Sequence, residues 1–395
     1  MSRPVRAGLV LTGGTVGSRR RRGGTGTVVS LVPAGGPVPP GLRLVRSALP
    51  RRWAYTFETV APLALASEDM RPGDWRTLAA TVRRLAAAGL DRVLVLHGTD
   101  TMGFTAAALS FLLRDTDVTV VLTGANLPPD QRGSDARRNI HDALVALAGL
   151  PPGTFVAFTG GADLPGLVHL GTQVRKVGTH GQPYQSVNRP PVAQVQDDAL
   201  SIVDPTVTVR PPCPVPDPLT APDPGVLSFR LYPGLDLDAM RAAVEAGEAR
   251  AVVVELYAAV TGPTVAGSRS LPAFIEKCRA GDVCVFLTVS APATNHANVY
   301  DSYLALRDAG GVYLPGMIPE TAIVKCMWAL GRTRDPAALV RLMRTPVAGE
   351  FGDTAPWPGV PAISAVGRGA AWTEERQRRG KGAPGAPHGA NRECQ

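Results

Sequence analysis

Two stretches of the sequence decide the fold, Gly8-Leu9-Val10-Leu11-Thr12-Gly13-Gly14-Thr15 and Arg92-Val93-Leu94-Val95-Leu96-His97-Gly98-Thr99-Asp100. Each contains a short apolar run, and each run is followed by a glycine and a threonine. Apolar runs without polar alternation are typical of strands buried on both faces, as in a parallel sheet with helices on either side. The two stretches therefore predict an α/β fold with a parallel sheet in the N-terminal part of the chain.

The pattern of strand followed by helix continues beyond these stretches. Further strands are predicted at residues 118–122 and 155–158. Apolar residues at helical spacing predict helices at residues 74–88, 104–113 and 134–147. Strands and helices that alternate in this way build an open sheet covered on both faces.

Prolines gather between residues 205 and 224, and a segment this rich in proline is typical of a linker. We expect an N-terminal α/β catalytic domain at 1–205, the linker at 206–225, a smaller C-terminal α/β domain at 226–350 and a disordered tail at 351–395. In the second domain the patterns predict strands at 226–231, 251–256 and 283–289, and helices at 235–248, 271–280, 299–309, 320–330 and 336–343.

Composition excludes several classes of protein. Of the 395 residues, 45% are hydrophobic, which is enough for a sizeable core and excludes disorder throughout. We find no apolar run of the roughly 18 residues that a membrane span needs and no signal-peptide pattern. The five cysteines lack zinc-ligand spacing, so we expect neither a metal nor a disulfide framework. A cytoplasmic protein without a membrane partner is the resulting expectation.

The formal charge of +8 raises the question of a nucleic-acid partner. The four arginines at residues 19–22 and those of the tail are expected in loops without interleaved aromatic residues. Solvated surface is therefore the better interpretation, and we expect no nucleic-acid partner.

The glycine–threonine pairs carry the chemical signal. In an open parallel sheet the ligand crevice lies beyond the carboxyl ends of the strands, so Thr15 and Thr99 would present two hydroxyl groups to one place. This arrangement suggests nucleophilic acyl chemistry, with Asp100 adjacent to the second hydroxyl. The alternative is a tight strand-to-helix turn with no chemical role, or a turn that touches a phosphate.

Lys176 is the other candidate, because only four of the 41 basic residues are lysines. Where positive charge alone is needed, this chain uses arginine, so a lysine beside Arg175 indicates an amine that can lose its proton. Survival of this lysine by chance is the alternative. His97 and His180 are further loop candidates, although a lone histidine is more often structural.

Residues 10–17 and 96–102 resemble the two signature segments of the bacterial-type L-asparaginases. The likeness continues in the substrate loop at 67–75, the segment that follows the third strand at 122–139, the lysine loop at 171–176 and the closing helix around 316–325. It covers about residues 7 to 350. The spacing of the motifs resembles the type I, cytoplasmic-like branch.

This resemblance implies a mechanism for hydrolysis of the side-chain amide of L-asparagine. Thr15 forms an acyl-enzyme, and Thr99, Asp100 and Lys176 relay protons. No metal and no organic cofactor are needed. The residues expected to bind the small-molecule amide are Gly14, Ser67, Glu68, Asp100, Gly124 and Ala125, the last two as part of an oxyanion hole.

The resemblance also implies a homodimer or homotetramer in which residues after Gly225 complete the active site of a neighbouring subunit. Two segments depart from the family. The loop after Thr15 lacks the family's tyrosine, and residues 257–270 lack its Gly-Asn-x-Pro loop. We expect residues 17–26 to form an open loop and free asparagine to be a weak substrate. Another primary amide, such as glutamine or a peptide-borne asparagine, and a binding homologue without turnover remain alternatives.

Overall fold

The computed structural model describes residues 4–14, 18–23, 26–31, 40–161, 164–208, 219–290 and 300–352. These residues belong to one compact unit, Met1–Ile363. Thr15, half of the expected linker (209–218) and nearly all of the expected tail lie outside the described residues. The bounds predicted for the linker and the tail therefore stay predictions.

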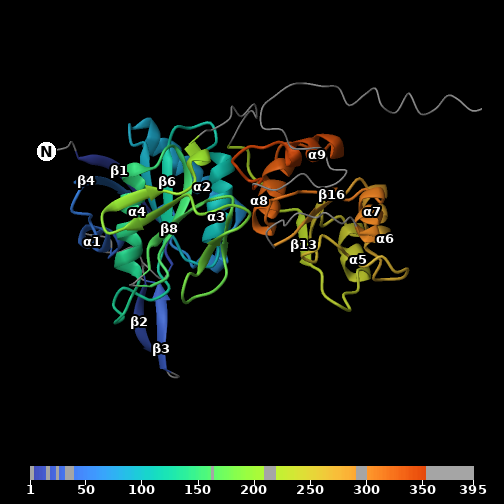
Figure 1. Ribbon diagram of the computed structural model, residues 1–395, viewed down its shortest axis with the longest axis horizontal. Helices are drawn as coiled ribbons and strands as arrows, with labels where there is room; N and C mark the ends of the chain where they lie inside the picture. The colour runs from blue at the N-terminus through green and yellow to red at the C-terminus, as the bar shows by residue number, and fades with distance from the viewer. Residues whose placement is uncertain are drawn as a thin grey trace, which may run out of the picture. The chain divides into compact units, whose positions relative to one another are not determined.

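The N-terminal domain is built on an eight-stranded sheet with the order β12-β11-β8-β7-β6-β5-β1-β4 (Figure 1). Its first five strands in chain order run parallel: β1 (Val5–Leu11), β4 (Tyr55–Val60), β5 (Arg92–Leu96), β6 (Thr119–Thr123) and β7 (Gly153–Phe158). The remaining three pair in the antiparallel sense: β8 (Gly166–Leu170), β11 (Ala193–Gln196) and β12 (Ala199–Ile202). The strand nearest the N-terminus, β1, thus lies between β4 and β5.

Helices cover both faces of this sheet, because successive side chains of each buried strand point to opposite faces. Val10 of β1 packs in a cluster with residues of α2 and α3, whereas Ala7 and Leu9 pack in a second cluster with residues of α1 and α4. The helices are α1 (Pro40–Ser47), α2 (Pro72–Ala87), α3 (Met102–Leu112) and α4 (Ala136–Gly149), with the short 3-10 helices η2 (Ser67–Asp69) and η3 (Pro205–Thr208).

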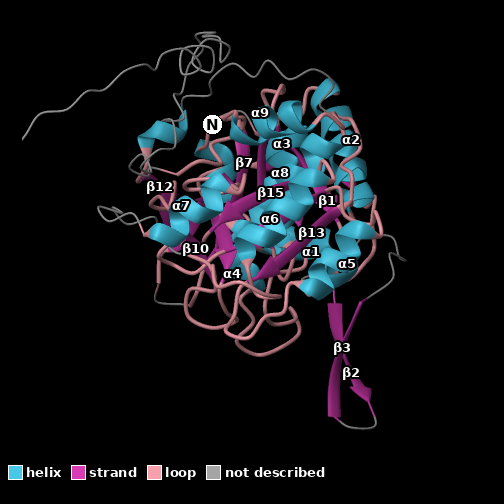
Figure 2. Ribbon diagram, turned by 90° about the vertical axis from the view of Figure 1, so that its right-hand side faces the viewer, coloured by secondary structure: helices cyan, strands magenta, loops and turns pink. Residues whose placement is uncertain are grey.

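The C-terminal domain has a smaller, four-stranded parallel sheet. Its strands are β13 (Val226–Arg230), β14 (Ala251–Glu255), β15 (Cys284–Thr288) and β16 (Val312–Tyr313). Its helices are α5 (Asp238–Glu245), α6 (Leu271–Ala280), α7 (Asp301–Asp308), α8 (Pro319–Leu330) and α9 (Pro336–Arg344) (Figure 2). The predicted fold class, a larger and a smaller α/β domain with parallel sheets, is confirmed.

Two hairpins complete the described structure. Strands β2 (Ser18–Gly23) and β3 (Gly26–Leu31) pair in the antiparallel sense, as do β9 (Val174–Lys176) and β10 (Tyr184–Ser186). The prediction that residues 19–22 lie in an open loop is wrong, because they form β2. Its partner strand carries the β-branched run Thr27-Val28-Val29, and residues of this type favour strands. In both ribbon views the β2–β3 hairpin stands apart from the large sheet (Figures 1 and 2).

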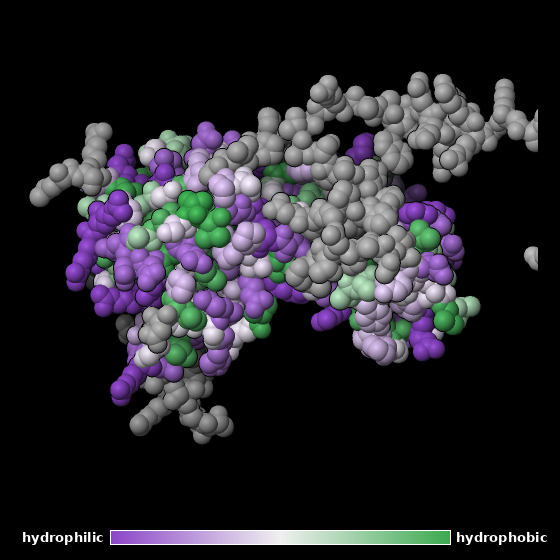
Figure 3. All heavy atoms as spheres, in the orientation of Figure 1, coloured by the Kyte–Doolittle hydropathy of each residue, from purple (hydrophilic) through white to green (hydrophobic). Residues whose placement is uncertain are grey.

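The side of the N-terminal domain that faces the viewer in Figure 3 is mostly hydrophilic, with smaller hydrophobic patches between the polar side chains. Among the described residues, no helix combines the length and the apolar character required to cross a bilayer.

Candidate active site

The loops that leave β1 and β5 touch through their backbones. The amide and the hydroxyl of Thr12 both donate to the carbonyl oxygen of Leu96, each at 3.1 Å. Gly14 has a φ of +75°, and a Cβ at this position would lie 2.4 Å from the Cα of Gly98. No side chain fits there, so glycine is required by the contact as well as by the backbone conformation. Gly14 is the last described residue before Thr15, so the side chain of Thr15 is not described.

Ser67 of η2 lies against the same loop. A Cβ on Gly98 would be 2.7 Å from the Oγ of Ser67. This Oγ accepts a hydrogen bond from the amide of Asp100 at 3.3 Å, and the hydroxyl of Thr101 donates to the Ser67 carbonyl at 2.7 Å. The neighbouring Glu68 is exposed, and one of its carboxylate oxygens is 3.5 Å from the Ser67 Oγ. The expected substrate-binding segment and the second signature are therefore in direct contact.

Lys176, at the end of β9, meets both polar residues of the second signature. Its Nζ donates to the Oγ1 of Thr99 at 2.7 Å and to the Oδ1 of Asp100 at 2.7 Å. The side chain of Lys176 is 16% exposed, whereas that of Asp100 is 66% exposed. Three of the four residues expected to be catalytic thus form one hydrogen-bonded group, in which the buried hydroxyl of Thr99 is held by the amine.

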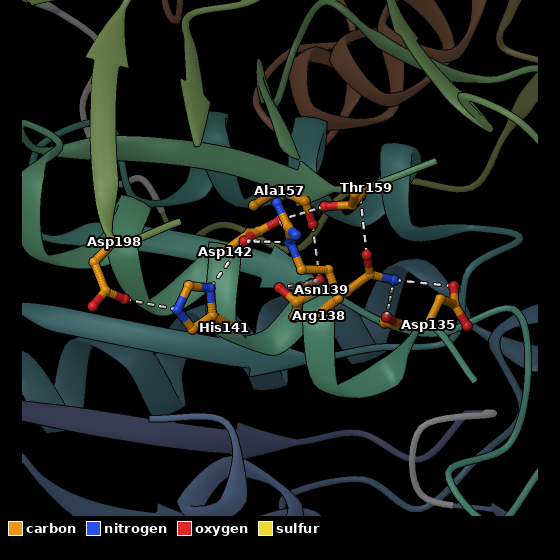
Figure 4. Close-up of polar contacts among 10 residues, drawn as sticks. Asp135, Arg138, Asn139, His141, Asp142, Ala157, Thr159 and Asp198 are labelled. Carbon is orange, nitrogen blue, oxygen red and sulfur yellow. Dashed lines mark hydrogen bonds and ion pairs between the residues drawn. The ribbon is translucent and has the colours of Figure 1, made fainter. Parts of the chain in front are cut away.

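The turn after β6 contacts the loop that follows β5 from the side opposite to β1, because β5 lies between β1 and β6 in the sheet. A Cβ on Gly124 would lie 2.4 Å from the carbonyl oxygen of His97, so this turn also packs against backbone. The side-chain amide of Asn139 donates to the Gly124 carbonyl at 3.0 Å and to Asp135 at 3.0 Å (Figure 4). Asp135 in turn accepts from the amide of Asn126. The start of α4 therefore holds the shape of the Gly124–Ala125 turn.

The two histidines considered as loop candidates make hydrogen-bond contacts with their neighbours in the sequence. Burial lowers the pKa of His97 to about 4, so its ring is neutral at pH 7, and its Nδ1 is 2.7 Å from the carbonyl oxygen of Gly98. His180 makes a 3.0 Å contact through its Nδ1 with the hydroxyl of Thr179 and is exposed.

A second polar cluster is formed by residues of α4 and of the segments that pack against this helix. No pattern in the sequence indicates it. The ring of His141 contacts Asp142 through Nδ1 at 3.0 Å and Asp198 through Nε2 at 2.9 Å (Figure 4). Asp142 is buried and also accepts from Arg138 and from the hydroxyl of Thr159. The hydrogen bond to Asp142 raises the pKa of His141, burial opposes this shift, and Asp198 adds to it. The cluster joins α4 to the turn between β11 and β12.

Another of the scarce lysines is structural. Lys325 of α8 is fully buried, donates to the carbonyl oxygen of Met343 at 3.0 Å and forms an ion pair with the buried Glu350. Scarcity of lysine alone therefore does not identify a chemical group, and what distinguishes Lys176 from Lys325 is its contact with Thr99 and Asp100.

The carboxyl edge of the C-terminal sheet forms a pocket of about 640 Å³. Glu255 at the end of β14 lies in it, 3.5 Å from Arg230 and hydrogen-bonded to Ser290. Arg175, which precedes Lys176 on β9, bonds Glu320 of α8 at 2.7 Å and approaches Glu255 at 3.9 Å. Burial raises the pKa of Glu320, and Arg175 opposes this rise. The described residues contain no cluster of three or more His, Cys, Asp or Glu side chains that could hold a metal ion.

Comparison with known families agrees with this geometry. Residues 7–207 match the family described as Asparaginase, N-terminal, and residues 225–343 match the Glutaminase/Asparaginase C-terminal domain. The L-asparaginase of Thermococcus kodakarensis is 34% identical over 298 residues, which cover 75% of this chain and 86% of that protein. A Glutamyl-tRNA(Gln) amidotransferase subunit of Pyrococcus horikoshii is 33% identical, over 72% of this chain and 64% of that protein.

Solved structures give the same result. The thermostable L-asparaginase from T. kodakarensis superposes with a TM-score of 0.71 at 30% identity, covering 88% of this chain and 100% of that one. L-asparaginase I from Vibrio cholerae has a TM-score of 0.70 at 23% identity, over 88% of this chain and 99% of that one, and shows a shared fold.

Proposed function

Because the chain belongs to the asparaginase family, we propose that it hydrolyses the side-chain amide of L-asparagine to L-aspartate and ammonia through a threonine acyl-enzyme. An asparaginase-type amidohydrolase is the class that the family and the T. kodakarensis L-asparaginase support. The observation that carries the mechanism is the bonding of Lys176 to Thr99 and Asp100, beside the loop that leads into Thr15.

In the proposed reaction the Oγ of Thr15 attacks the amide carbon, and its proton passes to the group formed by Thr99, Asp100 and Lys176. Collapse of the tetrahedral intermediate breaks the C–N bond, and a proton from this group leaves with the nitrogen as ammonia. Water then attacks the ester carbon and gives a proton to the same group. The bond between this carbon and the Thr15 oxygen breaks, L-aspartate leaves, and a proton from the group restores the Thr15 hydroxyl. Each step needs an amine that gives and takes a proton, which lysine does and arginine does not.

The substrate is a zwitterion, so its two charged groups need opposite partners. We assign the α-carboxylate to Ser67 and the α-ammonium to Asp100 and Glu68. Backbone N–H groups around Thr99 and the Gly124–Ala125 turn would hold the developing oxyanion, a contribution that is often the largest in acyl transfer. The packing of Gly124 on the His97 carbonyl supports this, since it brings the two loops to backbone distance.

We further propose a homodimer, or a homotetramer built from such dimers, in which residues after Gly225 line the partner's pocket. The pocket around Arg230, Glu255 and Ser290 offers charged and hydroxyl groups at the sheet edge where such a contribution would be made. Sedimentation of the purified chain should give a dimer or tetramer at concentrations where it is active. An active monomer at nanomolar concentration would reject this assembly.

The second candidate for the substrate is a primary amide other than that of free asparagine. The similarity to the amidotransferase subunit of P. horikoshii supports this alternative. The chain spans 64% of the length of that protein and 86% of the length of the L-asparaginase, so a free amino-acid amide comes first. Glutamine and short peptides that contain asparagine are the alternatives within the same chemistry.

An ammonia-release assay with asparagine, glutamine and amide peptides decides among these. Wild type is compared with Thr99→Ala, and Thr154→Ala is the control because Thr154 is a buried threonine of β7 outside the site. Asparagine should be preferred to glutamine, with a KM above about 1 mM, and only Thr99→Ala should abolish turnover. Turnover that prefers another amide would move the assignment to that substrate. Absence of ammonia from every amide would leave a binding homologue.

A further inference from the structure

The β9–β10 hairpin carries a second group aimed at the site. Tyr184 of β10 is the direct partner of Lys176 across the antiparallel pair. Directly opposed residues in such a pair project from the same face of the hairpin. Lys176 and Tyr184 therefore approach residue 99 together from one element.

Their targets on that residue differ. Lys176 donates to the side-chain hydroxyl of Thr99 at 2.7 Å, and the hydroxyl of Tyr184 donates to the backbone carbonyl of Thr99. Tyr184 is 1% exposed, and the centroid of its ring is 4.9 Å from that of Phe158. Burial, with a smaller contribution from Asp100, raises the pKa of Tyr184 well above its usual value. Its hydroxyl is therefore a donor throughout the neutral range.

We propose that Tyr184 is a positioning residue, whose bond to the Thr99 carbonyl fixes the second signature loop so that the Thr99 hydroxyl stays in reach of Lys176. The expected effect of Tyr184 on turnover rests on the proposed function. The claim that Tyr184 holds Thr99 near Lys176 does not, because it follows from the hydrogen bonds of the β9–β10 hairpin.

The physical reason lies in the two points of attachment. Lys176 holds the side chains of Thr99 and Asp100, and Ser67 holds the Asp100 amide, which belongs to the same peptide group as the Thr99 carbonyl. The bond from Tyr184 to that carbonyl holds the opposite side of this planar group and so limits its rotation. Misplacement of a reacting group by about 1 Å costs up to about a hundredfold in rate, so a constraint of this kind has a large effect on kcat. The amide of the same peptide group donates to the Ser67 Oγ at 3.3 Å, so loss of the Tyr184 bond should also have a smaller effect on substrate binding.

The test compares Tyr184→Phe with Tyr55→Phe. Tyr55 is a matched control, because its hydroxyl also donates to a backbone carbonyl, that of Leu144 at 2.6 Å, and its ring also contacts a phenylalanine, Phe57, with 5.4 Å between the ring centroids. Both variants should lose similar thermal stability. Only Tyr184→Phe should lower kcat, by about tenfold, and any rise in its KM should be smaller than this fall in kcat.

A second readout does not require turnover. The chain has four lysines, so labelling with ¹³C,¹⁵N-lysine gives few side-chain signals, and the signal of Lys176 is the one missing in Lys176→Met. The chemical shift of this signal should change in Tyr184→Phe and remain that of wild type in Tyr55→Phe. The chemical shifts of Lys277, Lys325 and Lys381 should be unchanged in both variants.

The outcomes distinguish failure of the proposed function from failure of the positioning role of Tyr184. If wild type releases ammonia, a kcat of Tyr184→Phe within twofold of wild type overturns the positioning role, and so does an equal loss in Tyr55→Phe. If wild type releases no ammonia, the proposed function fails and the lysine signal decides. Movement of the Lys176 signal in Tyr184→Phe alone then supports the positioning role, and an unmoved signal overturns it.

Discussion

The carboxyl edge of the N-terminal sheet and that of the C-terminal sheet are built differently. At the first edge, three loops approach through glycines, at Gly14, Gly98 and Gly124, so that backbone lies on backbone. At the second, the strand ends carry charged side chains, Arg230 and Glu255, around a pocket. Backbone contacts cannot be rearranged without unfolding a loop, whereas ion pairs between side chains change partners easily. The same strand arrangement thus gives one edge suited to fixed catalytic geometry and another suited to adjustable binding.

Loss of a hydroxyl at the first edge should have the largest effect. We expect Thr15→Ala and Thr99→Ala each to lower ammonia release by at least about a thousandfold, because nucleophile and relay act as a unit. Circular dichroism should show that both variants remain folded. A variant that retained more than a tenth of wild-type activity would contradict the two-threonine mechanism and weaken the distinction between the edges.

Lys176→Arg comes next. Arginine keeps the charge but does not release its proton near neutral pH, so kcat should fall about a hundredfold or more, nearly as far as in Lys176→Met. Lys277→Arg is the control, since the side chain of Lys277 is 59% exposed in an ion pair with Glu245 of the C-terminal domain. Rescue of most activity by arginine would mean that position 176 needs only positive charge.

At the second edge, Glu255→Gln should act on binding. Removing one charge from the group of Arg175, Arg230 and Glu255 should raise KM about two- to fivefold and leave kcat within about twofold, in the range of partly exposed ion pairs. Glu245→Gln, in an exposed pair, should change neither constant. A loss of kcat comparable to that of Lys176→Arg would place chemistry at both edges.

The sequence predicted most strands and helices of the core, because buried elements need continuous or periodic apolar residues. It missed α1, β8 and β11, although each contributes residues to the core. It missed β4, whose exposed and partly buried residues alternate at the edge of the sheet, and the short strand β16. It also missed the β2–β3 hairpin, since four adjacent arginines contain no apolar period.

The candidate site could be predicted only where it follows the signature loops. The bond from Tyr184 to Thr99 joins residues 85 positions apart, and that from His141 to Asp198 joins residues 57 apart. Neither tyrosine nor histidine stands out locally in this sequence. Such contacts depend on strand register and helix docking, which a single sequence does not specify.

The four arginines of β2 should affect specificity modestly. Replacing Arg19, Arg20, Arg21 and Arg22 with glutamine should lower the ratio of kcat/KM for a longer or acidic amide to that for asparagine, by about threefold at low salt and less at moderate salt. The measurement is this ratio in wild type and in the quadruple variant. An unchanged ratio would leave these arginines as ordinary surface charges and asparagine as the better substrate assignment.

The smallest expected effect is on the stability of the folded protein. It concerns His141, whose contacts with Asp142 and Asp198 join α4 to the turn between β11 and β12. Because its pKa is raised above the ordinary 6.5, protonated His141 stabilises the folded state below about pH 6.5, and this contribution is lost as pH rises through the raised value. The free energy of unfolding should therefore fall over that interval in wild type, but not in His141→Gln. Hydrogen exchange should show the change in α4 and β12 rather than in α6. An equal pH dependence in both proteins would assign it elsewhere.

The place of β1 between β4 and β5 has a consequence during synthesis. Both partners are encoded after β1, and the second ends at Leu96. From the end of β1 at Leu11, a ribosome that adds about 5 to 20 residues per second needs about 4 to 17 seconds to reach Leu96, and longer to clear it from the exit tunnel. For this interval the apolar strand that leads into Thr15 has only one partner at most. The nascent chain is therefore exposed to aggregation at the segment that later forms the active site, and binding by a chaperone that recognises short apolar segments would protect it there.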